Sequence, residues 1–81
     1  MTSTFHNPTN IIELNDIFNQ VQQSQHTLYF SDRQGNTYII RQVNLSKNII
    51  CGYVGTNPNN SLETTWNTFL RLKDSIWESD I

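Results

Sequence analysis

The chain has 81 residues and a net charge of −2, with five Lys and Arg side chains against seven Asp and Glu. A chain of this length suits one domain, which buries only roughly 60% of the surface that its unfolded chain exposes. Because basic side chains are so few, the composition excludes the strong electrostatic footprint of a monomer that binds nucleic acid. We therefore expect one small domain over residues 1–81.

Cysteine usage and hydropathy bound the cellular setting. The single cysteine excludes an internal disulfide, and residues 1–30 hold no basic segment followed by an apolar core and a cleavage site. No apolar run approaches the roughly 20 residues that span a bilayer. We expect a cytoplasmic protein that does not insert in a membrane.

The first predicted helix covers residues 11–23. Residues 1–9, polar around Phe5, precede it as either a frayed tail or a short edge strand. Asn10 followed by Glu13 has the spacing of a capping box. The apolar side chains of the helix fall at i, i+3, i+4 and i+7, which predicts one buried face. They are Leu14, Ile17, Phe18 and Val21.

Three short apolar runs follow, and polar turns separate them. We predict strands at Thr27–Ser31, Thr37–Val43 and Ile49–Val54. In the first run Leu28 and Phe30 alternate with polar residues, as in a strand with one buried side. Consecutive strands joined by turns of this length predict a three-stranded antiparallel meander.

A second helix is predicted from Ser61 to about Glu78, after the loop at residues 55–60. Asn60 and Glu63 repeat the capping spacing of the first helix. At 100° per residue its apolar side chains cover an arc of about 120°. These are Leu62, Trp66, Phe69, Leu70, Ile76 and Trp77, and Leu72 widens the arc. The predicted fold is α+β, helix, three-stranded meander, helix, with both helices on one sheet face.

The residues that carry chemistry do not form a recognisable catalytic or metal site. Cys51 lies in the middle of a predicted strand, away from the cations or helix N-terminus that activate a thiol, so we expect it to be inert. His6 and His26 are too few and too distant in sequence for a zinc site. We predict no catalytic residues, metal or cofactor.

Two binding surfaces are suggested instead. Tyr29, Tyr38 and Tyr53 alternate with polar residues on the strands, a pattern compatible with stacking on single-stranded nucleic acid. The predicted second helix has more apolar width than one sheet face covers, which favours a protein contact near its end. The residues predicted for that contact are Leu70, Leu72, Lys73 and Trp77.

Two stretches resemble the prevent-host-death (Phd/YefM) antitoxins of bacterial toxin-antitoxin pairs. The first is residues 13–40, ELNDIFNQVQQSQHTLYFSDRQGNTYII, which is similar to the family's helix, short strand, basic turn and second strand. The second is residues 60–65, NSLETT, similar to the segment that opens the family's next helix.

The resemblance implies an intracellular antitoxin that forms a homodimer through its N-terminal half and binds operator DNA there. It implies that the C-terminal segment neutralises a toxin, and it places Arg33, in the basic turn, near DNA. Two other functions remain open. One is a stand-alone inhibitor or adaptor, such as a phage-encoded counter-defence protein, that occupies a partner's surface. The other is a small enzyme or ligand carrier.

Overall fold

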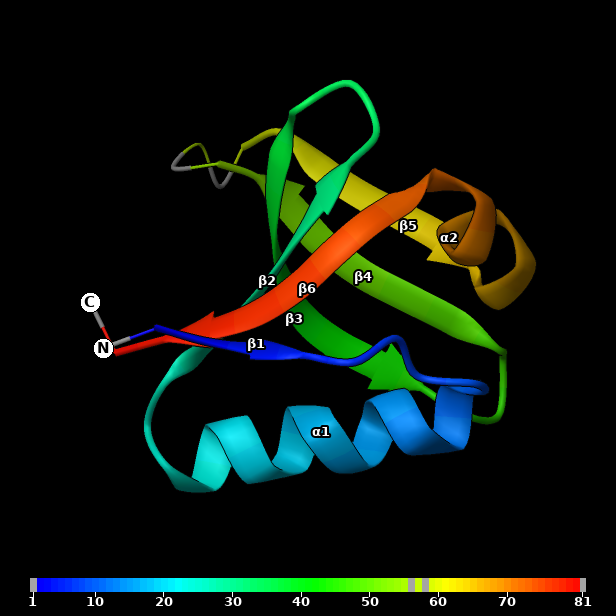
Figure 1. The fold of residues 1–81 in the computed structure, drawn as a ribbon. Helices are drawn as coiled ribbons and strands as arrows, with labels where there is room; N and C mark the ends of the chain where they lie inside the picture. The colour runs from blue at the N-terminus through cyan, green and yellow to red at the C-terminus, as the bar shows by residue number, and fades with distance from the viewer. Residues whose placement is uncertain (1, 56, 58, 81) are drawn as a thin grey trace.

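A computed structural model describes residues 2–55, 57 and 59–80, and Figure 1 shows their arrangement. These residues form one sheet and two helices. The elements in chain order are β1 (Thr2–Phe5), α1 (Ile11–Gln23), β2 (Thr27–Asp32), β3 (Thr37–Asn44), β4 (Ile49–Val54), β5 (Ser61–Thr65), α2 (Trp66–Leu72) and β6 (Lys73–Ser79). No helix within the described part of the chain is both long and apolar enough to cross a membrane.

The predicted fold is wrong in its sheet. The sheet has six strands in the order β1-β6-β2-β3-β4-β5, and every neighbouring pair is antiparallel. β2, β3 and β4 form the predicted meander, but β5 extends it on one side. On the other side β6 lies between β2 and β1, so the last strand of the sequence is internal to the sheet (Figure 1). Residues 2–5, left open as a tail or an edge strand, form the edge strand β1.

The predicted helix at residues 61–78 is also wrong. Only Trp66–Leu72 is helical, and a strand flanks it on each side. The β-branched pair Thr64 and Thr65 favours an extended backbone. Thr65 then ends β5 and caps α2, because its hydroxyl accepts a hydrogen bond from the Thr68 amide at 3.4 Å.

The helix α1 has the predicted bounds, and both of its ends are capped. The Asn10 side chain accepts a hydrogen bond from the Glu13 amide at 2.9 Å. At the other end the His26 amide donates to the Val21 carbonyl and the Gln25 amide to the Gln22 carbonyl. This pair of hydrogen bonds is a Schellman motif. It requires a left-handed backbone at Gln25, which has a φ of 61°.

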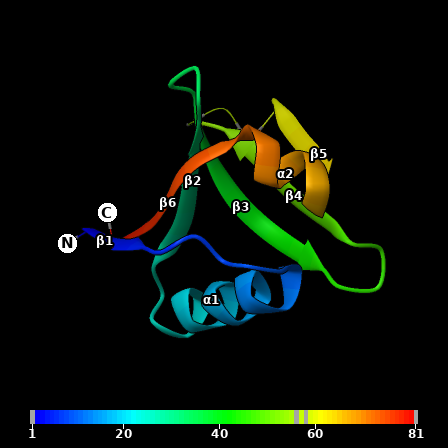
Figure 2. The ribbon, with the colours of Figure 1, turned by 45° about the vertical axis from the view of Figure 1, so that its right-hand side comes forward.

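One hydrophobic core holds the sheet and both helices together. Its strand residues Leu28, Phe30, Ile40, Ile50 and Ile76 all lie on one side of the sheet, which we call the inner face. Both helices contribute to the same cluster, α1 through Leu14, Ile17 and Val21 and α2 through Trp66 and Phe69. Figure 2 shows α1 and α2 at different ends of this curled sheet. The opposite, outer face therefore carries neither helix.

Two positions of the sheet have strict local requirements. Gly52 on β4 lies so close to β3 that a Cβ there would overlap the Ile39 carbonyl oxygen. Asp32 is buried at the β2–β3 turn, where its carboxylate accepts hydrogen bonds from the Gln34 and Asn36 amides and from the Tyr38 hydroxyl. The first requirement is met by the absence of a side chain at Gly52, and the second by the carboxylate of Asp32.

Candidate functional site

The outer face carries a continuous row of large side chains across four neighbouring strands. Trp77 on β6 pairs with Tyr29 on β2, Tyr29 with Ile39 on β3, and Ile39 with Tyr53 on β4. We call these four residues the outer row. Directly paired residues share one face of a sheet, so the four side chains project together. All four are partly exposed to solvent.

Tyr29 and Trp77 form the aromatic end of the outer row. Their ring centroids are 5.7 Å apart and their planes differ by 8°. Such an offset-stacked pair is stabilised beyond its buried area. Each ring covers part of the other, so less of either face is open for a nucleic-acid base.

Tyr38 does not belong to this surface. It lies on the inner face, where its ring stacks on Phe30 at 4.8 Å and its hydroxyl donates to the Asp32 carboxylate at 3.0 Å. Burial, followed by the neighbouring Asp32, raises the pKa of the Tyr38 hydroxyl. The three tyrosines therefore do not form the single stacking surface that their alternation suggested.

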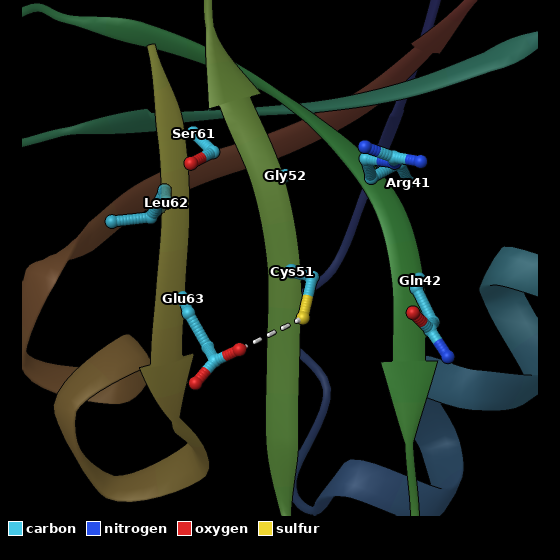
Figure 3. A pocket seen from close by; sticks show the side chains of 7 residues that line it. All are labelled: Arg41, Gln42, Cys51, Gly52, Ser61, Leu62 and Glu63. Carbon is cyan, nitrogen blue, oxygen red and sulfur yellow. Dashed lines mark hydrogen bonds between the residues drawn. The ribbon is translucent and has the colours of Figure 1, made fainter. Parts of the chain in front are cut away.

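Beside the outer row, a shallow hollow of about 240 Å³ crosses β3, β4 and β5. Figure 3 shows Cys51 in its middle, with Glu63 on one side and Gln42 and Arg41 on the other. A register shift between Ile40 and Gln42 marks a β-bulge at Arg41. The residues that line the hollow are Arg41, Gln42, Cys51, Gly52, Ser61, Leu62 and Glu63.

The hollow places a thiol beside a carboxylate. The Cys51 Sγ atom lies 3.8 Å from the Glu63 Oε2 atom. Burial raises the pKa of the Cys51 thiol, and the negative charge of Glu63 raises it further. A thiol with a raised pKa has little thiolate at neutral pH and is a poor nucleophile.

Neither histidine lies with this thiol. His6 contacts Glu13 at 3.1 Å near the start of α1, and His26 lies 3.5 Å from Glu78 beside β6. Among residues 2–55, 57 and 59–80, no group of three His, Cys, Asp or Glu side chains is arranged to hold a metal ion. The thiol in the hollow therefore lies beside the Glu63 carboxylate, and both histidines contact other acidic residues.

The four residues predicted to bind a partner are not on one helix. Leu70 and Leu72 lie on α2, where Leu70 is 37% exposed and Leu72 packs against the core. Lys73 is buried at the start of β6, and its ammonium donates to the Asn7 side chain at 2.8 Å. Trp77 is in the outer row. A partner contact at these four positions stays a prediction.

Arg33 lies exposed in the turn between β2 and β3, away from the outer row. Its contact with DNA also stays a prediction. Sequence reasoning missed Tyr29, Ile39 and Tyr53 as a set, although bulky residues on both sides of β3 were visible. The row could be found only once β6 was known to pair with β2.

No family model, curated protein or solved structure matches the chain. The resemblance to the prevent-host-death antitoxins stays a prediction. Its second stretch, residues 60–65, lies where this structure forms the strand β5.

Proposed function

We propose that this protein acts by binding another protein through the outer row, without catalysis. The observation that supports this is the partly exposed row Trp77, Tyr29, Ile39 and Tyr53, on the sheet face opposite the core in which both helices pack. Tryptophan and tyrosine are the side chains most enriched at the energetic centres of protein interfaces. The row supplies three of them, with Trp77 beside Tyr29 and Tyr53 on the far side of Ile39.

The surroundings of the outer row suit a protein interface as well. Small hydroxyl side chains flank it, and Ser31 and Ser75 share a hydrogen bond of 2.9 Å across β2 and β6. Arg41 and Glu63, in the adjacent hollow, bring charge to one end of this region. Interface centres are depleted in charge and enriched in aromatic residues, with a polar rim around them.

The positions of the cations favour an inhibitor or adaptor over an operator-binding antitoxin. Of the five basic residues, Lys73 is buried, while Arg33 and Lys47 lie in separate turns. DNA binding depends on several phosphate contacts made together and weakens steeply with salt. We therefore expect no salt-sensitive binding of operator DNA by the monomer, which an electrophoretic shift measured at two salt concentrations checks.

The test of protein binding uses a photo-crosslinking residue in place of Tyr53 in cells that express the protein. We expect a covalent adduct with a partner from position 53 and none from Gln22, which is exposed on α1. The purified partner should then bind Trp77→Ala at least about 30-fold more weakly than wild type. Leu45→Ala, which truncates an exposed apolar side chain elsewhere, should bind like wild type.

Thermal unfolding of the same variants separates binding from folding. Trp77→Ala loses its stack with Tyr29 and should unfold at a somewhat lower temperature than wild type while keeping its native spectrum. Unchanged partner affinity in a destabilised Trp77→Ala variant would assign Trp77 to the fold alone. It would contradict the proposed function.

A further inference from the structure

β5 is an open edge of the sheet, and its register with β4 shows which of its backbone groups bond to β4 and which point outward. The Val54 amide donates to the Asn60 carbonyl and the Trp66 amide to the Asn48 carbonyl, one bond at each end of the β4–β5 ladder. Between them the register is continuous. Hydrogen-bonded pairs alternate in an antiparallel ladder, so Leu62 and Thr64 turn their backbone groups toward β4.

The backbone groups of Ser61, Glu63 and Thr65 consequently point away from the sheet. β5 is last in the strand order, and no described strand lies beyond it. The Thr65 carbonyl accepts a hydrogen bond from the Thr64 hydroxyl at 3.3 Å. Ser61 and Glu63 thus present a donor and an acceptor each, at the spacing that another strand requires.

The usual protections of an edge strand are scarce in β5. It contains no proline, lysine or register shift, and Glu63 is its only charged residue. Glu63 stands at the centre of the strand and is exposed. This single anion decides which strand can pair with the edge.

A second copy of the chain is a poor occupant. Antiparallel pairing of β5 with its own copy brings the two Glu63 side chains directly opposite each other or to diagonal positions. Like charges at such positions are destabilising, and each copy also carries a net charge of −2. A strand with Lys or Arg opposite Glu63 would instead be stabilised by the attraction between opposite charges.

We infer that β5 adds an extended segment of a partner protein as a seventh strand, with a basic side chain of that segment opposite Glu63. The added strand would continue the sheet beyond the hollow, so that main-chain hydrogen bonds supply affinity and Glu63 supplies selectivity. This inference rests on the proposed protein-binding function and names a second part of the contact.

The test measures amide hydrogen exchange by NMR in the full chain, with a defined peptide as the probe. The blocked peptide Thr-Thr-Val-Lys-Val-Thr-Thr should slow exchange at Ser61, Glu63 and Thr65. It should leave Leu62 and Thr64 unchanged, because their amides already bond to β4. The same peptide with Glu in place of Lys should bind roughly fivefold more weakly.

Two substitutions separate the contribution of the backbone hydrogen bonds to peptide binding from the contribution of the Glu63 charge. Glu63→Pro removes the central outward donor without removing a bond to β4, so it should keep the native spectrum and lose peptide binding. Glu63→Gln keeps every backbone donor, and it should bind the Lys and Glu peptides with nearly equal affinity.

Each other outcome overturns the inference. Slowed exchange at β1 or unchanged exchange at all three β5 amides would show that this edge does not accept a strand. Slowing of those amides in the protein alone, at concentrations where it dimerises, would make a second copy the occupant. Peptide-induced shifts confined to the Trp77 and Tyr29 signals would reject the β5 contact and leave the proposed function standing.

Discussion

At the scale of single residues, Gly52 has the strictest steric requirement. A methyl group at this position would overlap a backbone atom, the Ile39 carbonyl oxygen, which no side-chain movement relieves. We expect Gly52→Ala to lower the free energy of unfolding by about 3 kcal/mol, because β3 and β4 must separate. Urea unfolding measures this change. Cys51→Ala, at the preceding position of β4, should lower the free energy of unfolding clearly less. Equal losses in the two variants would contradict the steric explanation.

Asp32 makes stability depend on pH. Burial alone would raise its pKa, but hydrogen bonds from Asn36, Tyr38 and Gln34 outweigh burial and hold the pKa below the ordinary value of 3.8. A lowered folded pKa contributes stability above the unfolded pKa, and this contribution is lost as pH falls through the folded pKa. Asp32→Asn should therefore be less stable than wild type at neutral pH.

The difference between wild type and Asp32→Asn should shrink as the pH falls from about 4 to about 2. Chemical unfolding across this range measures it. Asp16→Asn, which replaces an exposed carboxylate on α1, is the matched control. A difference that stays constant with pH would mean that the carboxylate of Asp32 acts only through its shape.

Cys51 should react slowly with thiol reagents. Burial and then Glu63 raise the pKa of its thiol, so the thiolate is scarce at neutral pH. We expect labelling in the native protein to be slower than that of free cysteine, and Glu63→Gln to accelerate it. The labelling rate of Cys51 should increase at a higher pH than the labelling rate of free cysteine. Labelling as fast as free cysteine would contradict both the burial and the charge argument.

At the scale of elements, the backbone at the end of α1 is strained, and glycine at this position would relieve the strain. Gln25 has a φ of 61°, a conformation that costs a residue with a Cβ about 1 kcal/mol and glycine little. Gln25→Gly should raise the free energy of unfolding by about 1 kcal/mol. Gln22→Gly, inside the same helix, should lower it by a similar amount. Thermal and urea unfolding of both variants check the opposite signs.

The segment from Ser61 to Ser79 shows where sequence reasoning failed. Trp66, Phe69 and Ile76 fit a helical spacing, yet they divide between α2 and β6 in the structure. Short apolar runs satisfy more than one period, and pairing partners decide between them. β6 gains its structure from β1 and β2, which lie far away in the sequence. By contrast, α1 carries local capping signals at Asn10 and Glu13, and its bounds could be predicted.

The same dependence on distant pairing explains what could be predicted of the candidate site. Trp77 stood out by residue type alone, because tryptophan is enriched at the energetic centres of protein interfaces. Its neighbours Tyr29 and Ile39 could not be joined to it, since the row exists only when β6 lies beside β2. The hollow around Cys51 likewise needs β5 beside β4. At the scale of the whole molecule, strand order creates both surfaces.

That strand order also predicts how the domain folds. β6 is the last strand in the sequence, but it lies between β1 and β2 and brings Ile76 into the core. Without β6, β1 has no strand to pair with, and the inner faces of β2 and α2 lose a buried neighbour. Non-local pairing of this kind makes the native contacts form together.

We therefore expect a chain that lacks residues 73–81 to lose the whole fold instead of retaining the meander β2–β5. A cooperative unfolding transition, followed through the buried Trp66, should disappear, and NMR dispersion should collapse. Adding residues 73–81 as a separate peptide should restore both signals, because the missing strand then fills its place between β1 and β2. Retention of a cooperative transition by the shortened chain alone would show instead that β2, β3, β4 and β5 hold together with the two helices, and that β6 only docks onto a finished sheet.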